Sequence, residues 1–189
     1  MVQLPALTMI TGGARSGKST YGEHLFGHHS EPVLYVATAL SRDKEMEQRI
    51  RDHRSQRPKH WHTLEAYRDF SNVLPQYKGK VSGVIVDCIT LMVTQLMLDQ
   101  YQGKWEKMKR EESIVIEDEV NSQITDLLDA LEALHVPAVM ITNETGWGIV
   151  PENRLSRDFR DIAGRGNQTV ARRADRVVLM VAGYPVTVK

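Results

Sequence analysis

The sequence contains very little cysteine. Cys88 is the only cysteine in 189 residues, so no disulfide can form within the chain. Disulfides are rare where thiols are kept reduced, and we therefore expect the protein to work in the cytoplasm. The amino-terminal residues do not combine a charged region with a long apolar stretch, so no signal peptide is expected.

Long hydrophobic runs and an excess of one charge are also missing. No apolar run approaches the roughly 18 residues of a membrane-spanning helix. The 24 basic residues balance the 24 acidic ones, which argues against nucleic acid as the main partner, because binding to its phosphates usually needs a basic excess. Hydrophobic residues make up 41% of the chain, which predicts one globular domain over residues 1–189.

Short β-prone runs alternate with helical patterns, which predicts an α/β fold with a mainly parallel sheet flanked by helices. The predicted strands are residues 7–11, 33–38, 62–65, 84–88, 138–143, 176–181 and 185–188, the last two forming a C-terminal β-hairpin. The predicted helices are residues 20–25, 41–56, 90–99, 112–134 and 153–173, the last broken near Gly164 and Gly166. The polar stretch 100–111 predicts a mobile surface loop.

Residues 12–19 fit the pattern G-x-x-x-x-G-K-[ST], the phosphate-binding loop of P-loop proteins of the RecA-like type. A β-prone run precedes them and a helical pattern follows, which is the context that this loop needs. Its glycines let backbone amides reach the phosphates, and the helix start adds partial positive charge. The predicted nucleotide-binding residues are Gly12, Gly13, Ala14, Arg15, Ser16, Gly17, Lys18 and Ser19. Lys18 should act on the β- and γ-phosphates, and the Ser19 hydroxyl should bind Mg²⁺.

A P-loop normally works with a metal-positioning acid at the end of another strand. Three apolar residues lead directly into Asp87, as in a buried strand that ends at this carboxylate. We therefore predict that Asp87 joins Ser19 in holding Mg²⁺. The alternative is that Asp87 caps the helix that starts near Thr90.

Two further strand ends should meet the P-loop at the same sheet edge. Ala37, Thr38 and Ala39 end the second strand with small side chains, which would let a nucleotide approach closely, although a simple turn fits equally well. Glu144 follows Asn143 after the fifth strand. It fits a general base, a metal ligand or a turn cap, and the sequence leaves all three open.

His53 is the most ambiguous of the candidate residues. It lies in a charged segment near Arg49, Arg54 and Arg57. The pattern alone favours a half-buried histidine on a helix face that it shares with apolar residues. The alternative is a nucleophile whose neighbouring arginines hold a triphosphate, because neutral imidazole can form a phosphoramidate.

Four motifs together resemble one known family. They are TGGARSGKS at 11–19, YVAT at 35–38, RIRDHRSQRP at 49–58 and the long block TNETGWGIVPENRLSRDFRDIAGRGNQ at 142–168. This combination closely resembles the bifunctional adenosylcobinamide kinases/adenosylcobinamide-phosphate guanylyltransferases of adenosylcobalamin (vitamin B12) biosynthesis. The resemblance covers nearly the full chain, whereas the P-loop alone would indicate only the superfamily.

The resemblance implies two reactions and a set of site residues. Enzymes of this family phosphorylate adenosylcobinamide with ATP or GTP, and then transfer GMP from GTP through a guanylyl-histidine to give adenosylcobinamide-GDP and pyrophosphate. The family's histidine corresponds to His53, which reverses the reading from the pattern alone. The family's nucleotide contacts correspond to residues 12–19 and 37–39 and to Arg54, Ser55, Gln56, Arg57, Glu65 and Asp87. A homotrimer is also implied.

The chain departs from the family pattern at three positions. Ala39, Asp52 and Asp87 stand where a member of the family carries serine, histidine and glutamate. Aspartate for glutamate keeps the charge but shortens the reach, so water could bridge Asp87 to Mg²⁺. Two other readings of the P-loop stay open on the residues alone: a small-molecule kinase without guanylyltransferase activity, and a non-catalytic nucleotide-dependent switch.

Overall fold

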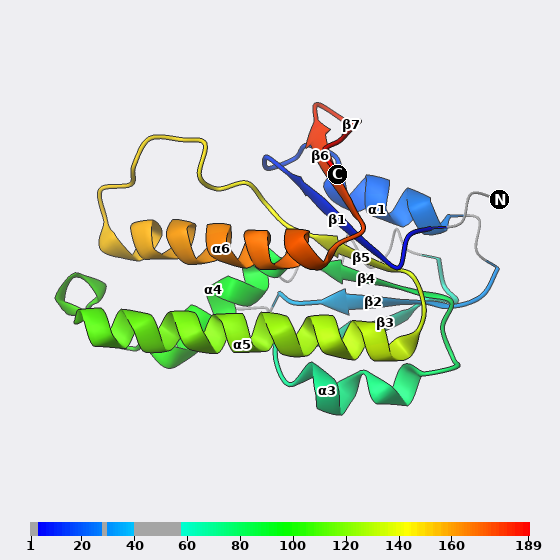
Figure 1. The fold of residues 1–189 in the computed structure, drawn as a ribbon, viewed down its shortest axis with the longest axis horizontal. Coiled ribbons are helices and arrows are strands. Elements are labelled where there is room, and N and C mark those ends of the chain that lie inside the picture. The colour runs from blue at the N-terminus through cyan, green and yellow to red at the C-terminus, as the bar shows by residue number, and fades with distance from the viewer. Residues whose placement is uncertain (1–3, 28–29, 40–57) are drawn as a thin grey trace.

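A computed structural model of the chain describes residues 4–27, 30–39 and 58–189. These residues form a seven-stranded sheet in the order β3-β2-β4-β5-β1-β6-β7 (Figure 1). All neighbouring strands are parallel except β6 and β7, which form an antiparallel hairpin at the carboxyl terminus. The predicted mainly parallel α/β fold with a terminal hairpin is therefore confirmed, and it is the fold of P-loop nucleotide-binding proteins.

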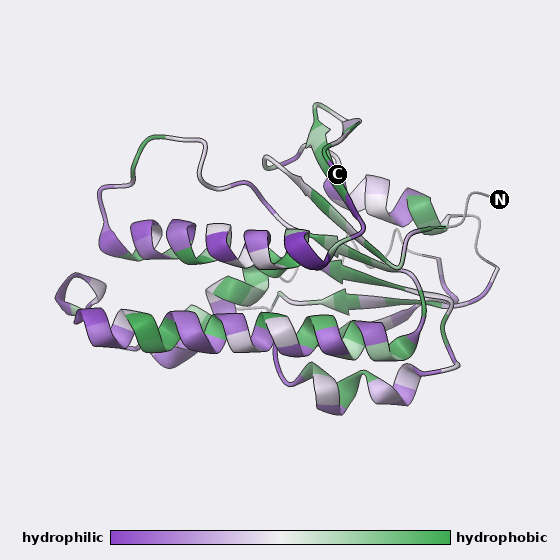
Figure 2. Cartoon of the chain, in the orientation of Figure 1, coloured by the Kyte–Doolittle hydropathy of each residue, from purple (hydrophilic) through white to green (hydrophobic). Residues whose placement is uncertain are grey.

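The strands lie within one or two residues of the predicted positions. They are β1 (Leu7–Gly12), β2 (Val33–Ala37), β3 (His62–Glu65), β4 (Gly83–Asp87), β5 (Ala138–Ile141), β6 (Arg176–Val181) and β7 (Tyr184–Thr187). The four central strands β2, β4, β5 and β1 consist mostly of buried residues, as expected for strands covered on both faces. Much of these strands is hydrophobic in Figure 2.

The helices cover the two sheet faces unequally. They are α1 (Lys18–Phe26), α3 (Phe70–Val73), α4 (Ile89–Gln100), α5 (Arg110–Leu134) and α6 (Arg154–Arg173), with short 3₁₀ helices η1 (Pro75–Tyr77) and η2 (Trp105–Lys107). Helix α1 lies on one face, whereas α3, α4, α5 and α6 pack together on the other (Figure 1). Alternate side chains of each strand accordingly enter two separate cores, with Ile10 in one and Met9 in the other.

The prediction of a break in the last helix is wrong. Helix α6 runs without interruption through Gly164 and Gly166. A Cβ atom at Gly166 would lie 2.7 Å from Ile124 Cδ1 of α5, whereas one at Gly164 would meet no atom within 4 Å. Gly166 therefore permits the close approach of α6 to α5 rather than ending a helix.

The prediction of a polar surface loop over residues 100–111 is also wrong in part. Trp105 and Met108 are buried in the main core, and Trp105 is the first residue of η2. The Arg154 guanidinium donates a hydrogen bond to the Met108 carbonyl, which ties this segment to the start of α6. Two apolar side chains among many charged ones were too weak a signal to predict this packing.

The predicted helix over residues 41–56 lies outside the described residues. None of the described helices combines the length and the low polarity that crossing a bilayer requires.

Candidate active site

The P-loop connects β1 to α1 with a backbone that requires glycine at two positions. Gly12 has φ +148° and Gly17 has φ +92°, both in the region that side chains disfavour. A Cβ atom at Gly12 would also lie 2.6 Å from the Met180 carbonyl oxygen of β6. Gly17 is the N-cap residue of α1 and has no side chain to cap it. The amides at the start of α1 are thereby left for a phosphate.

Lys18 begins α1 and lies folded back on the loop. Its ammonium group donates a hydrogen bond to the Gly13 carbonyl at 2.6 Å, and its side chain is almost fully buried. Burial lowers the pKa of Lys18 below its ordinary value, while the nearby Cys88 and Asp87 act in the opposite direction. A bound phosphate can replace the Gly13 carbonyl as the partner of this cation and would stabilise its charge.

Ser19 and Asp87 lie together, as the sequence predicts. The Ser19 hydroxyl donates a hydrogen bond to Asp87 Oδ2 at 2.8 Å. The Tyr35 hydroxyl of β2 donates to the same oxygen at 2.5 Å. A hydroxyl and a carboxylate fit Mg²⁺, which prefers oxygen ligands and usually keeps several waters and substrate phosphates in its shell. The alternative role of Asp87 as a helix cap is not what the structure shows, because the N-cap residue of α4 is Cys88 and this helix has no side-chain cap bond.

The register of three strands aligns further predicted residues with Asp87. Ala37 of β2 is paired with Asp87 of β4 on one side and with Glu65 of β3 on the other. Neighbouring strands are separated by about 4.8 Å, so these residues form a row leading away from the P-loop.

Thr38 stabilises this edge of the sheet by hydrogen bonds to backbone groups, so its hydroxyl is not free to bind a ligand. It is fully buried, and its hydroxyl donates to the Cys88 carbonyl at 2.6 Å and accepts from the Cys88 amide at 2.8 Å. Its own amide donates to the Asp87 carbonyl. Thr38 therefore fixes the end of β4 and the position of Asp87. Ala39 is the last described residue of this connection and is half-buried.

His53 and the predicted contacts Arg54, Ser55, Gln56 and Arg57 lie outside the described residues. Their assignment continues to depend on the sequence. The described residues that flank this segment are Ala39, which follows β2, and Pro58, which precedes β3.

Two contacts of the P-loop region are not among those predicted from the sequence. Tyr35 could have been found, because strand alternation places it on the same face as Ala37, two residues before the strand end. The second contact comes from the C-terminal hairpin, where the Gly183 amide donates to the Ser16 carbonyl at 3.0 Å. No local pattern predicts this contact, since it depends on the order of β1 and β6 in the sheet.

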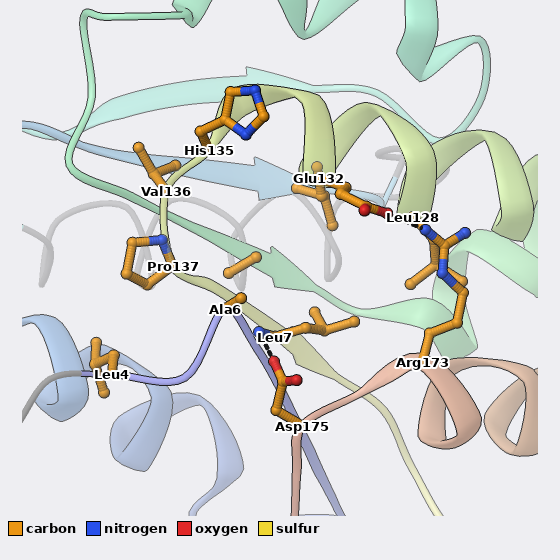
Figure 3. A pocket seen from close by; sticks show the side chains of 12 residues that line it. Leu4, Ala6, Leu7, Leu128, Glu132, His135, Val136, Pro137, Arg173 and Asp175 are labelled. Carbon is orange, nitrogen blue, oxygen red and sulfur yellow. Dashed lines mark hydrogen bonds and ion pairs between the residues drawn. The ribbon is translucent and has the colours of Figure 1, made fainter.

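A cavity of about 640 Å³ lies at the opposite end of the sheet (Figure 3). Its lining includes Leu7 at the start of β1, Ala138 at the start of β5 and the polar side chains of His135, Arg173 and Asp175. Asp175 accepts a hydrogen bond from the Leu7 amide at 2.8 Å, which joins β1 to the connection before β6. Of the predicted nucleotide-binding residues that the structure describes, none lines this cavity, which lies at the other ends of the strands from the P-loop.

Comparison with known proteins identifies one family along almost the whole chain. The family model described as cobinamide kinase/cobinamide phosphate guanyltransferase matches residues 8–188. The chain is 42% identical to the bifunctional adenosylcobalamin biosynthesis protein CobU of Escherichia coli over 97% of this chain and 99% of that protein. The same identity and coverage apply to its counterpart in Salmonella typhimurium. It is 37% identical to CobP of Pseudomonas aeruginosa over 96% of both chains.

The P-loop geometry, the serine–aspartate pair and the similarity along almost the whole chain lead to one assignment. The chain belongs to the cobinamide kinase/cobinamide phosphate guanyltransferase family of adenosylcobalamin biosynthesis.

Proposed function

We propose that this chain carries out both reactions of its family at the β1–α1 edge of the sheet. In the first it phosphorylates adenosylcobinamide with ATP or GTP. In the second it transfers GMP from GTP to the resulting phosphate and releases pyrophosphate. The observation that carries the proposal is the hydrogen bond from Ser19 to Asp87 beside the P-loop. In that loop Lys18 donates to the Gly13 carbonyl, and a phosphate oxygen could take the place of this carbonyl.

Two groups would act on the triphosphate. Lys18 would exchange Gly13 for phosphate oxygens and stabilise the charge that develops on the leaving group. Ser19 and Asp87 would hold Mg²⁺, with water bridging to Asp87 if its side chain is too short. The metal would supply charge neutralisation on the phosphates and orient them. Glu65 and residues 37–39 would then face the nucleoside end.

His53 would be the nucleophile of the transfer reaction. Its neutral imidazole attacks the α-phosphorus of GTP, an N–P bond forms, and the bond to the β-phosphate oxygen breaks as pyrophosphate leaves. A phosphate oxygen of adenosylcobinamide phosphate then attacks the same phosphorus. The N–P bond breaks, and His53 returns to its neutral form. Arg54 and Arg57 are suited to hold the triphosphate during the first displacement.

Labelling with α-³²P-GTP tests this reaction. We expect the protein to acquire label that is lost in acid and retained in base, as a phosphoramidate requires, and to pass it to adenosylcobinamide phosphate. His53→Ala should abolish labelling, whereas His62→Ala, at an exposed position of β3, should not. Labelling that persists in His53→Ala would contradict the nucleophile assignment.

Lys18→Ala tests the phosphate role of the P-loop. We expect both the kinase and the transferase reactions to fall by about 100-fold or more, because one preorganised charge contact is lost in each transition state. Full activity in either reaction would contradict a shared P-loop. A purely nucleotide-dependent switch would instead bind GTP and show no acceptor turnover.

The organisation around this site is also a proposal. One domain over residues 1–189 would hold the nucleotide, and the corrinoid, which exceeds a drug-sized pocket of about 300–1,000 Å³, would need a wider groove. A homo-oligomer, a trimer by family resemblance, could supply that groove between subunits. Sedimentation of the full chain would give the number of subunits, and the cytoplasmic location would be checked by cell fractionation.

A further inference from the structure

Strand β5 ends between the two halves of the phosphate site. In the sheet it is flanked by β1, which leads into the P-loop, and by β4, which ends at Asp87. Neighbouring strands are about 4.8 Å apart, so the end of β5 lies one strand spacing from each neighbour. Glu144 follows this end, three positions after Ile141, the last residue of β5.

Glu144 is held against the first residues of the P-loop. Its amide donates to the Gly12 carbonyl at 3.1 Å, and the Thr11 hydroxyl donates to Glu144 Oε1 at 2.6 Å. Thr11 is buried, which restricts the hydroxyl that fixes this carboxylate. Oε2 accepts no hydrogen bond from the described residues, and the side chain is half-buried. One carboxylate oxygen is therefore fixed, and the other is available to a ligand.

A buried polar network holds the backbone that carries Glu144. The Thr142 hydroxyl donates to Asn167 Oδ1 of α6 at 2.7 Å and lies 3.2 Å from the Thr90 hydroxyl of α4. Thr90 also accepts from the Asn143 amide at 2.8 Å, and the Asn167 side-chain amide donates to the Asn143 carbonyl at 3.1 Å. The end of β5 is thus joined to two helices, and a rigid support of this kind is what a catalytic side chain needs.

The two reactions of the proposed function differ in their need for a base. In the kinase reaction the nucleophile is an alcohol, which must lose its proton as it attacks the γ-phosphorus. In the transferase reaction the nucleophiles are a neutral imidazole and a phosphate that is already anionic, so no proton has to be removed. A carboxylate that serves only as a base would therefore matter to the kinase reaction alone.

We infer that Glu144 is the general base of the kinase reaction, an inference that rests on the proposed function. Glu144 Oε2 takes the proton of the acceptor hydroxyl while the new O–P bond forms and the bond to the β-phosphate oxygen breaks. The nucleoside diphosphate leaves with its electron pair, and Glu144 then passes the proton to water. Asp87, the carboxylate at the end of the neighbouring strand β4, already accepts hydrogen bonds from Ser19 and Tyr35 at Oδ2 and is assigned to Mg²⁺ in the proposed function.

Glu144→Gln separates this role from a structural one. Glutamine keeps an oxygen that can accept the Thr11 hydroxyl and keeps the backbone bond to Gly12, but it cannot take a proton. Each variant is assayed twice: with adenosylcobinamide and γ-³²P-ATP for the kinase, and with adenosylcobinamide phosphate and α-³²P-GTP for the transferase. We expect kinase kcat to fall by about 10²- to 10⁴-fold, the usual contribution of a general base, with histidine labelling and GMP transfer preserved.

Two further variants complete the design. Glu152→Gln changes an exposed carboxylate in the same connection between β5 and α6 and should leave both reactions unchanged. Glu144→Asp keeps the carboxylate at shorter reach and should restore part of the kinase rate. Parallel loss of both reactions in Glu144→Gln, or an unchanged kinase rate, would overturn the assignment. If the unmodified protein turned over neither acceptor, the proposed function itself would fail.

Discussion

The Ser19 hydroxyl and the Asp87 carboxylate, 68 residues apart in sequence, are joined by a hydrogen bond of 2.8 Å. Both oxygens therefore lie close together, as the two proposed ligands of one magnesium ion would have to. Replacing the charged ligand by its neutral amide, Asp87→Asn, should lower kcat/KM of both reactions by about 100-fold or more, because Lewis-acid stabilisation contributes several kcal/mol. The measurement is the rate of each reaction as a function of Mg²⁺ concentration.

Asp87→Glu is the matched control for this change. It keeps the negative charge, and we expect it to keep most of the activity and the dependence on Mg²⁺. If Asp87→Asn responded to Mg²⁺ as the unmodified protein does, Asp87 would not be a metal-positioning residue.

Tyr35 should strengthen the binding of Mg²⁺ at the proposed metal site without contacting the nucleotide. Its hydroxyl donates to the same Asp87 oxygen as Ser19 does, so it restricts the direction in which the carboxylate points. Tyr35→Phe should weaken activation by Mg²⁺ by about 10- to 100-fold, the usual effect of removing such a partner, and leave kcat at saturating Mg²⁺ nearly unchanged.

Tyr67→Phe is the control for Tyr35→Phe, because Tyr67 donates a similar bond of 2.6 Å to Asp99 far from the P-loop in sequence. Its response to Mg²⁺ should match that of the unmodified protein. Equal Mg²⁺ responses of the two phenylalanine variants would remove the role assigned to Tyr35.

The first two glycines of the P-loop should differ sharply in their tolerance of a methyl group. Gly12 has φ +148°, and a Cβ atom there would lie 2.6 Å from the Met180 carbonyl, whereas at Gly13 no atom lies within 4 Å. We expect Gly12→Ala to lower the free energy of unfolding by roughly 2 kcal/mol. In a chain of this size, that loss lowers the melting temperature by about 4–8 °C. Gly13→Ala should leave it unchanged, and calorimetry without nucleotide compares the two. Equal melting temperatures would contradict the close contact between the P-loop and β6.

The sequence predicted the parts of this protein that depend on short-range patterns. Short apolar runs predicted the strands, and the spacing of glycine, lysine and serine predicted the P-loop. The apolar run that ends at Asp87 predicted that this carboxylate lies beside Ser19. The contact of Gly183 with Ser16 could not be predicted, because it depends on β6 lying beside β1. The role of Thr38 could not be predicted either. A threonine at a strand end can bind a ligand or, as in this structure, the backbone of a neighbouring strand end.

The interruption predicted in α6 failed for a related physical reason. Glycine lowers helix propensity, but a long helix packed on a neighbour tolerates it, and tertiary contacts decide. At Gly166 the neighbour is Ile124 of α5, which leaves no room for a side chain. Sequence patterns contain no direct signal for such a contact between helices.

This difference between the two glycines of α6 predicts opposite effects on stability. Gly164→Ala adds a methyl group in open space and should raise the free energy of unfolding by about 0.5–1 kcal/mol through helix propensity. Gly166→Ala places Cβ 2.7 Å from Ile124 Cδ1 and should lower it, by about 1–3 kcal/mol if the core cannot adjust. Urea unfolding followed by circular dichroism measures both. Stabilisation by Gly166→Ala would mean that Ile124 moves aside at little cost.

Cys88 should be unreactive in the folded protein although it directly follows Asp87 of the candidate active site. Its side chain is 5% exposed, and burial, aided by the negative charge of Asp87, raises its pKa to about 12. Three pKa units above the ordinary value of 9.0 reduce the thiolate at pH 8 by about 1,000-fold, and only the thiolate reacts with iodoacetamide. Alkylation measured by mass spectrometry should therefore be slow until guanidinium unfolds the chain.

Between pH 9 and 11 the alkylation rate of the folded protein should still rise about tenfold per pH unit, while the rate of the unfolded chain levels off. Similar rates for the folded and unfolded chains at pH 8 would show that Cys88 is reached by solvent, and that the edge formed by Asp87 and Thr38 opens in solution.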